Sequence, residues 1–595
     1  MPVLRVDVDE RQIVLHSEGQ LCATTQELVE SDAFARVVGL YVARLEAHDP
    51  DALARIGLTG DDARERLLEL LRLLANNPLD RITRASGVHA GLPTQREHLH
   101  GFVEGLYDFW RRYDRFLVSR ADPAAERGEW RPYRSFNETL EALGRLVRAL
   151  YRDIAENVTA THPRVYRQVA AGCEVGVVAA PRRAAIPARY RKLLGGVPFV
   201  RQVLMYPPLL LDPPANTRSG RFIEVDEDPL SGLRLDREHW LCYPALVGPL
   251  TVFVYFHLRF AGLGLSLANL FEMASDDEIA AGPDAVYVYG APPEALARFG
   301  EQPTVFHDDA ESRLLVAAVP LEDRFGYFGY VKKMALTLHN LAVMKRGRMP
   351  FHGAFTHIVL TDGTTANVLL IGDTATGKSE SLEALRLAGE DRIREMRVIA
   401  DDMGSLEVGD DGVVRGYGTE IGAFVRLDDL QQGYAFQQMD RAIIMSPQRV
   451  NARVVVPVAT LEDVLHGYPV DFILYANNYQ PVDDDHPVVE VIADVDEALG
   501  VFREGAALAK GTTTATGLTH CYFANVFGPA QRVATHDELA RRTFGAAYAT
   551  GVTVGQLRTR LGLAGYESEG PRAAALALLD LIARRASSAK GADPS

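Results

Sequence analysis

The sequence predicts a mixed α/β protein, and three observations predict this class. Residues 26 to about 170 repeat apolar side chains every three or four positions, as amphipathic helices do. From about residue 175, short β-branched runs alternate with glycine and proline, as strands and turns do. Further along the chain, apolar strands alternate with short helical patterns, which is typical of a sheet covered by helices.

The length of 595 residues indicates several packed units, since one domain usually holds about 150 residues. We expect a helical N-terminal extension over 1–175, a mixed domain over 176–325 and a third domain over 326–565. A terminal helix and frayed tail should occupy 566–595. With 47% hydrophobic and 24% charged residues, the chain has the composition of a globular protein.

The N-terminal region begins with a predicted strand over 4–15 and continues as amphipathic helices. Its helical segments include DDARERLLELLRLLANN, REHLHGFVEGLYDFWRRYDRFLV and FNETLEALGRLVRALYRDIAENV. The second segment carries Phe109, Trp110 and Tyr113, which would give a protein partner a surface if they were exposed. The alternative is that these rings belong to the core, as they do in most amphipathic helices.

Charge and cysteine content exclude several classes of partner. Lys and Arg number 63 and Asp and Glu 79, a net charge of −16. We therefore expect neither nucleic acid nor a membrane as partner, because excess cationic charge is what holds both. The four cysteines include no CxxC pair, which argues against a disulfide framework and a thiolate zinc site. The sequence shows no apolar signal segment and no stretch of about 18 uncharged apolar residues, so we expect a cytoplasmic protein.

A phosphate-binding loop is the sharpest local motif. An apolar strand leads into Gly372, Asp373, Thr374, Ala375, Thr376, Gly377, Lys378 and Ser379. A helical pattern follows, so the segment fits G-x-x-x-x-G-K-[ST] in its strand–loop–helix context. Backbone amides and the helix N-terminus would hold phosphate oxygens, Lys378 would neutralise the β and γ phosphates, and Ser379 would bind Mg²⁺. The sequence therefore predicts a site for ATP and Mg²⁺, although the identity of the base stays open.

A second strand, MRVIA, ends in Asp401 and Asp402. Adjacent carboxylates close after a phosphate loop supply the hard oxygen ligands that a nucleotide-bound divalent ion needs. The alternative is a solvated turn at a strand end. Asp483, Asp484 and Asp485 lie between prolines instead, and we expect them in an exposed loop without function.

Three further segments accompany this loop. Upstream is GYFGYVKKMALTLHNLAVMKRGRMPFHGAF, which contains Tyr327, Lys332, Lys333 and His352. Downstream are VNARVVVPV, which contains Arg453, and GAALAKGTTTATGLTHCYFANVFGPA. Together with the phosphate loop and the acidic strand end, these segments resemble those of the phosphoenolpyruvate carboxykinases, especially the ATP-dependent class, and follow the same order.

The resemblance covers residues 326–530 well and 176–325 loosely, and it has no counterpart for the first 170 residues. It implies a carboxykinase-like phosphate-loop domain, a mixed N-domain on the substrate side, and an extra helical N-terminal region. The S-E after the loop lysine and the V-I-A-D-D strand are closer to the HPr kinase/phosphorylase group, which is a second resemblance.

The resemblance implies a second metal. Lys333, His352 and Asp402 would bind Mn²⁺, and Asp401 would hold the nucleotide's Mg²⁺ through water. A lysine ligand must be neutral, and burial beside a dication and Lys332 would lower its pKa. The alternative is an amphipathic helix that exposes both lysines to water.

The resemblance also implies substrate contacts. Lys332 and Arg453 would bridge the transferred phosphoryl group and the enolate oxygen, and Tyr327 would contact the substrate carboxylate or the departing carbon dioxide. In NTRSGRF, Arg218 or Arg221 would hold the substrate carboxylate, but the P-K of the family's G-R-S-P-K is missing there.

Two departures from the family concern the acceptor. Residues 511–520 read GTTTATGLTH where the carboxykinases read A-G-T-E-R-G-I-T-E-P. The chain therefore lacks both glutamates of that segment, and it also lacks the arginine that contacts nucleotide phosphates. After Asp402 the chain reads Met-Gly-Ser instead of E-H-G. Phosphoryl transfer is therefore better supported than the identity of the acceptor.

Three functions remain open. The first is a carboxykinase that converts oxaloacetate and ATP to phosphoenolpyruvate, carbon dioxide and ADP, with a small anionic substrate. The second is a kinase that phosphorylates another small molecule or a protein hydroxyl without decarboxylation. The third is a nucleotide-sensing protein whose helical N-terminal region binds a protein partner.

Overall fold

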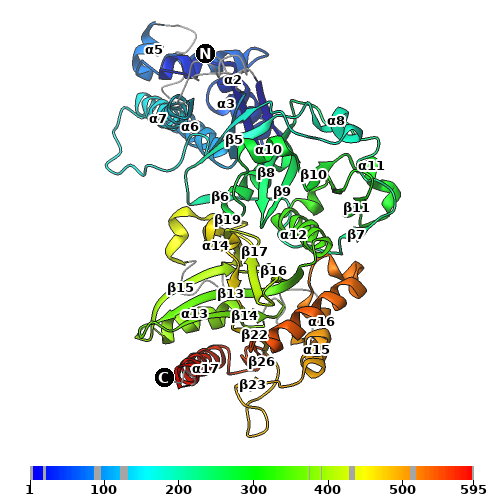
Figure 1. The fold of residues 1–595 in the computed structure, drawn as a ribbon. Helices are drawn as coiled ribbons and strands as arrows, with labels where there is room; N and C mark the ends of the chain where they lie inside the picture. Colours follow the sequence, from blue (N-terminus) through cyan, green and yellow to red (C-terminus); the bar gives the residue numbers. More distant parts are fainter. Residues whose placement is uncertain are drawn as a thin grey trace. The chain divides into compact units, whose positions relative to one another are not determined.

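The computed structural model shows a mixed α/β protein with several mixed sheets, 39% helix and 27% strand (Figure 1). The structure describes residues 5–17, 22–85, 95–120, 132–373, 376–389, 391–427, 436–509 and 517–591. The chain forms two compact units. Unit 1 consists of Met1–Pro181 and Pro198–Asp212, and unit 2 consists of Arg182–Val197 and Pro213–Ser595. The expected boundary at 175 therefore falls inside unit 1, and those at 325 and 565 fall inside unit 2.

Unit 1 contains a sheet in addition to its helices, so it is not the purely helical extension that we expected beyond its first strand. Its paired strands, in spatial order, are β1 (Arg5–Val8), β2 (Gln12–Ser17), β3 (Asp114–Arg120), β4 (Val175–Ala180) and β5 (Phe199–Met205). A further short strand is β6 (Leu209–Leu211). β2, β3 and β4 are parallel, and parallel neighbours need long crossover connections, which the helices provide.

The helices of unit 1 pack around one apolar core. They are α1 (Thr25–Glu30), α2 (Asp32–His48), α3 (Ala52–Arg55), α4 (Ala63–Leu74), α5 (Leu79–Ala85), α6 (Arg96–Arg111) and α7 (Pro132–Thr159). α4 and α7 lie where the apolar spacing predicts them.

The helix predicted over REHLHGFVEGLYDFWRRYDRFLV is correct up to Arg111, and its C-terminal end is wrong. α6 ends at Arg111, and RFLV belongs to β3. Consecutive buried apolar residues fit a strand paired on both sides as well as a helix, so periodicity cannot separate the two. Arg115, which is 1% exposed, donates to the carbonyls of Trp110 and Tyr113 at 3.2 and 3.0 Å and so stabilises the end of the helix.

The aromatic residues of α6 face the interior. Phe109 is buried and packs edge-on against Tyr113. Trp110 is half-buried and donates its indole N–H to the carbonyl of Ala171 at 2.6 Å. These rings pack in or against the core of unit 1, which confirms the interpretation of this helix as core and not as an exposed partner surface.

The first sheet of unit 2 lies within the segment that we expected to be a mixed domain. Its strands, in spatial order, are β8 (Trp240–Val247), β9 (Leu250–His257), β10 (Ala285–Ala291), β12 (Leu314–Pro320), β11 (Val305–Asp309) and β7 (Ile223–Glu224). The accompanying short helices are α8 (Ala188–Leu194), α9 (Ala261–Leu265), α10 (Asp276–Ala281) and α11 (Pro293–Leu296). β8, β10 and β12 are buried along their whole length.

The second sheet of unit 2 carries the phosphate loop. Its strands, in spatial order, are β21 (Tyr468–Pro469), β17 (Val414–Gly418), β16 (Met403–Val408), β13 (Met349–Leu360), β14 (Thr365–Ile371), β22 (Phe472–Asn477), β26 (Thr553–Arg558) and β23 (Val489–Val491). β15 (Ile393–Ala400) also pairs with β13. β14, β22 and β26 are parallel, so their carboxyl ends share one edge. Ligands of open α/β sheets bind at such an edge.

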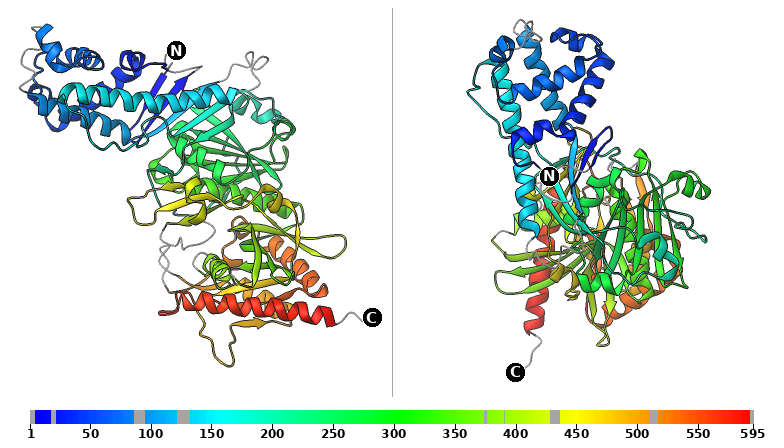
Figure 2. Two further views of the ribbon diagram at one scale, coloured as in Figure 1. Left: turned by 90° about the vertical axis from the view of Figure 1, so that its left-hand side faces the viewer. Right: turned by 90° about the horizontal axis from the view of Figure 1, so that it is seen from above.

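Helices and small sheets complete unit 2. The helices are α12 (Phe328–Lys345), α13 (Lys378–Ala388), α14 (Leu461–Leu465), α15 (Val495–Glu504), α16 (Val533–Ala549) and α17 (Glu569–Gly591). One small sheet contains β18 (Gly422–Arg426), β20 (Arg453–Pro457) and β19 (Ile443–Met445), and another pairs β24 (Ala506–Leu508) with β25 (Leu518–His520). α17, the long red helix in Figure 2, packs with α13 against apolar side chains of β13, β14 and β22. Among the described residues, no helix has both the length and the apolar character needed to span a bilayer.

Candidate functional site

Helix α12 brings a pair of lysines into the interior of unit 2. Nearly all of its residues are buried, and Lys332 itself is 1% exposed. Lys332 Nζ lies 3.0 Å from Asp402 Oδ2 and 2.7 Å from Glu420 Oε1. Lys333 Nζ lies 2.5 Å from the same oxygen of Asp402. Because a buried ammonium group needs an opposite charge, the two carboxylates explain how this helix tolerates both lysines, and the water-exposed alternative is wrong.

His352 approaches the same carboxylate from the long strand β13. Its ring is buried, and Nε2 lies 2.9 Å from Asp402 Oδ1. Nδ1 contacts the carbonyl oxygen of Ala524. Antiparallel pairing of β13 with β16 sets His352 opposite Met403, and the Gly353 amide donates to the Asp402 carbonyl at 3.0 Å. Backbone register therefore holds the histidine beside Asp402.

The charges in this cluster shift one another's pKa values. Burial, aided by the neighbouring Lys332, lowers the pKa of Lys333 to about 8 although Asp402 opposes the change. Burial also disfavours charged Lys332, but Asp402 and Glu420 outweigh it and raise its pKa. Burial would raise the pKa of Asp402, yet Lys332 and Lys333 hold it well below its ordinary value. Lys333 is thus the lysine of the pair that more easily becomes a neutral amine.

Lys333, His352 and Asp402 together present two nitrogens and a carboxylate. This donor set suits a divalent transition metal. The carbonyl of Ala524 at Nδ1 would fix the histidine tautomer that leaves Nε2 free as a ligand. Among the described residues, no group of three or more His, Cys, Asp and Glu side chains could hold a metal ion. A metal at this place would therefore depend on the lysine.

The phosphate loop follows β14 and leads into α13. Gly377 has φ +93° at the start of the helix, a left-handed conformation that glycine adopts without strain. Lys378 is buried, and its Nζ donates to the carbonyls of Gly372 and Asp373 at 2.5 and 2.9 Å. Burial lowers the pKa of Lys378. Its amine thus lies over its own loop, where it would meet phosphate oxygens.

The structure does not describe every predicted loop residue in full. Thr374 and Ala375 lie outside the described residues. Ser379 is placed by its backbone in the first turn of α13. Thr376 is buried, and its hydroxyl donates to the carbonyl of Asp373 at 2.7 Å.

Backbone and side-chain contacts tie the loop to the carboxylate cluster and to the next parallel strands. The Gly372 amide donates to the His352 carbonyl at 3.1 Å. Thr559, at the carboxyl end of β26, donates its hydroxyl to the Thr376 carbonyl at 2.7 Å. Asp401 is buried, and its charge raises the pKa of both Lys332 and Lys378 against the effect of burial. The phosphate loop and the predicted metal ligands therefore form one site.

A cationic cluster lies beside the lysines around the ring of Phe424. The Arg453 guanidinium and the Lys332 ammonium lie 5.5 and 6.0 Å from the ring centre. The Tyr327 ring lies 5.9 Å from it. Arg453 Nε is buried and has no hydrogen-bond partner among the described residues. This cationic cluster offers an anion positive charge and the unpartnered N–H of Arg453.

Arg218 reaches the same area from the segment before β7. Its guanidinium lies 5.8 Å from the ring centre of Phe527, and Lys333 Nζ lies 4.3 Å from it. Burial lowers the pKa of Arg218, while Tyr330 and Tyr327 oppose this. Within the described parts of the chain, neither Arg218 nor Arg453 pairs with a carboxylate. Arg221, the other predicted candidate, is exposed.

Sequence reasoning missed Glu420, Phe424, Phe527 and Thr559. Glu420 carries a usable signal, because it is the only charged residue in GYGTEIGAFV. The two phenylalanines and Thr559 carry none, since their positions around the site depend on how distant segments pack. Asp483, Asp484 and Asp485 are exposed, as predicted. Most of the altered nucleotide segment, residues 510–516, lies outside the described residues.

No protein-family model matches the sequence, and no curated protein matches it.

Proposed function

We propose that the protein is a metal- and nucleotide-dependent phosphotransferase of the phosphoenolpyruvate carboxykinase type. One observation carries the proposal: Lys332, Lys333 and His352 all lie within 3.0 Å of the carboxylate of Asp402. These residues come from α12, β13 and the end of β15, and only the fold brings them together. Their arrangement beside the phosphate loop is what this chemistry needs, because phosphoryl transfer depends on positioning and charge neutralisation.

The nucleotide would bind along the loop from Gly372 to Ser379. The loop amides and Lys378 would hold the phosphates, with Mg²⁺ bound to Ser379 and, through water, to Asp401. Lys378 would exchange its present contacts with loop carbonyls for phosphate oxygens. Such an exchange leaves the buried ammonium paired throughout, which favours nucleotide binding.

A small dicarboxylate such as oxaloacetate would bind at the cationic cluster. Arg218 and Arg453 have no carboxylate partner among the described residues, and both lie near Tyr327. Substrate carboxylates would supply the missing acceptors for these guanidinium groups, which bind carboxylates in a planar fork. A kinase for an uncharged hydroxyl acceptor would leave both guanidinium groups without a carboxylate, so the cationic cluster favours a dicarboxylate substrate.

The reaction breaks the bond between the carboxylate carbon and C3 of oxaloacetate. Its electron pair forms the enolate of pyruvate, carbon dioxide leaves, and the enolate oxygen takes the γ-phosphoryl group of ATP, which leaves as ADP. Lys332 and Arg453 would stabilise the negative charge on the enolate and on the transferred group. Tyr327 would border the departing carbon dioxide.

Lys333, His352 and Asp402 would hold Mn²⁺, which supplies a Lewis acid at the enolate oxygen when bound. Lys333 favours this role because its pKa of about 8 makes the neutral amine accessible near neutral pH. Glu420 would keep Lys332 charged and in place, so that the two neighbouring lysines serve different tasks.

The test is a turnover assay with oxaloacetate, ATP, Mg²⁺ and Mn²⁺, in which phosphoenolpyruvate is measured directly. We expect product from the wild-type chain and a loss of about 10²-fold or more for Lys378→Ala, since that side chain faces the transferred charge. Absence of phosphoenolpyruvate under these conditions would contradict the proposal.

A kinase without decarboxylation is the second candidate, favoured by the S-E after Lys378 and by the altered residues 511–520. It predicts ATP consumption with a hydroxyl acceptor and none with oxaloacetate. Profiling ADP release across small-molecule and protein acceptors separates the two candidates, and Lys378→Ala should abolish either activity.

A further inference from the structure

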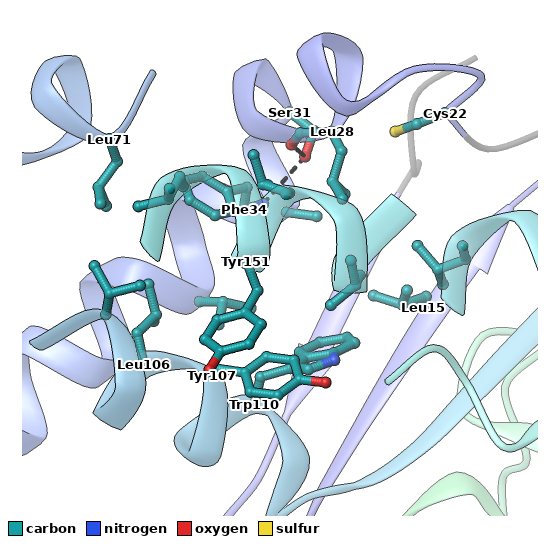
Figure 3. Close-up of a pocket in the computed structure, with 17 residues that line it drawn as sticks. Leu15, Cys22, Leu28, Ser31, Phe34, Leu71, Leu106, Tyr107, Trp110 and Tyr151 are labelled. Atoms are coloured by element: carbon teal, nitrogen blue, oxygen red, sulfur yellow. Dashed lines mark hydrogen bonds between the residues drawn. The ribbon is translucent and has the colours of Figure 1, made fainter. Parts of the chain in front are cut away.

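The helical side of unit 1 contains an apolar pocket of about 110 Å³ (Figure 3). Its walls come from β2, α1, α2, α4, α6 and α7. Protein interiors are close-packed and contain few voids larger than a water molecule. This volume is a hollow between packed helices that opens at its rim, and its apolar lining leaves it available to a ligand.

The floor of the pocket offers water no hydrogen bonds. It is formed by buried aliphatic side chains, including Leu71, Leu106, Leu150 and Ile154. A buried water needs two to four polar partners, and cavities lined by aliphatic side chains stay dry. The floor therefore suits hydrocarbon.

Most polar groups in the walls of the pocket already form hydrogen bonds within the protein. The Ser31 hydroxyl accepts from the Phe34 amide at 3.1 Å and donates to a carbonyl of α1. The Tyr151 hydroxyl donates to Glu104 at 2.7 Å, and the Trp110 indole N–H is also paired. Among the described residues that line the pocket, none carries a charged side chain that could pair with a charged ligand group.

The rim of the pocket consists of half-buried residues, among them Phe34, Tyr107, Val147 and Tyr151. Tyr107 and Tyr151 stack with ring centres 4.0 Å apart and planes 8° apart. Figure 3 labels both side chains at the pocket. Since these side chains reach solvent as well as the pocket, a ligand has a path from the surface to the floor.

We propose that unit 1 binds a small neutral molecule with an apolar part of about six carbons, such as a single hydrocarbon ring or a short alkyl chain. The size is close to what this class needs, because an apolar cavity of about 150 Å³ holds benzene and this pocket of about 110 Å³ also opens at its rim. The half-buried rim leaves room for a polar end group to remain in water. This site is separate from the phosphate loop and does not rest on the proposed phosphotransferase activity.

The test uses benzene and n-hexanol as probes with the full-length chain. Binding of each probe is measured by saturation-transfer NMR and by isothermal titration calorimetry. Val147→Phe adds bulk at the rim and should weaken binding of both probes at least tenfold. Val165→Phe adds the same bulk at a position that is 66% exposed in the same unit, and it should bind as the wild type does.

Two results would overturn the proposal. One is no saturable binding of either probe to the wild-type chain up to the probe's solubility limit. The other is equal binding by Val147→Phe and wild type. If Val147→Phe fails to fold, as judged by circular dichroism, Ala33→Leu fills the pocket from α2 with a smaller change and carries the same expectation.

Discussion

The partnership of Lys332 with Glu420 gives the sharpest test of how the site is built. Glu420 is 2% exposed, and its carboxylate contacts Lys332 on one side and accepts from the Thr419 hydroxyl on the other. Glu420→Gln keeps the shape of the side chain and removes only its charge. Lys332 would then depend on Asp402, which also neutralises Lys333.

Removing one partner of a buried ion pair costs about 3–5 kcal/mol. We expect about 3 kcal/mol for Glu420→Gln, because the glutamine carbonyl still accepts from Lys332. Glu407→Gln is the matched control. Glu407 lies on the nearby strand β16 and pairs with Arg348 at 2.9 Å, but its side chain is 37% exposed. A pair this exposed contributes at most about 1 kcal/mol.

The two free-energy losses can be compared by hydrogen exchange of α12, measured by mass spectrometry on the full-length chain. This helix carries Lys332, which loses its partner in Glu420→Gln. A loss of 3 kcal/mol raises the exchange rate of protected amides about 150-fold, since each 1.4 kcal/mol is about tenfold. Glu407→Gln should raise it less than about tenfold. If the two variants exchange alike, Glu420 does not stabilise Lys332 and our account of the buried pair is incorrect.

Three further expectations concern the same site. Gly377→Ala should abolish ATP binding measured by calorimetry, because residue 377 has φ +93° and a Cβ there would lie 2.8 Å from Thr559 Oγ1. The affinity for Mn²⁺ should rise about tenfold per pH unit and level off near pH 8, because a proton on Lys333 with a pKa of about 8 competes with the metal; a pH-independent affinity in calorimetric titrations would exclude that ligand. Arg453→Gln should raise the KM for oxaloacetate about tenfold or more, because a hydrogen bond to a charged group contributes about 1.5–3 kcal/mol; an unchanged KM would place the substrate elsewhere.

The sequence pattern was sufficient to predict those elements whose residues lie close together in the chain. The strand, the glycines and Lys378 of the phosphate loop follow one another within a short segment, and their order alone predicts strand, loop and helix. The same holds for α4 and α7, whose apolar spacing defines one buried face. Local pattern failed at β3, because its four consecutive buried residues, 115–118, lie between two parallel neighbours and show no alternation by which to recognise a strand.

By itself, the sequence determined the mixed α/β class, the strand–loop–helix order of the predicted phosphate loop and the set of residues from which a site could be built. The tertiary structure decided which of these meet. The pairing of β13 with β14 and β16 places His352 between the loop and Asp402, and the packing of α12 turns Lys332 and Lys333 toward that carboxylate. The lone charge of Glu420 in GYGTEIGAFV marks it in the sequence, but only the tertiary structure shows its role. The need for a second carboxylate arises from burying two adjacent ammonium groups, and burial is a property of the fold.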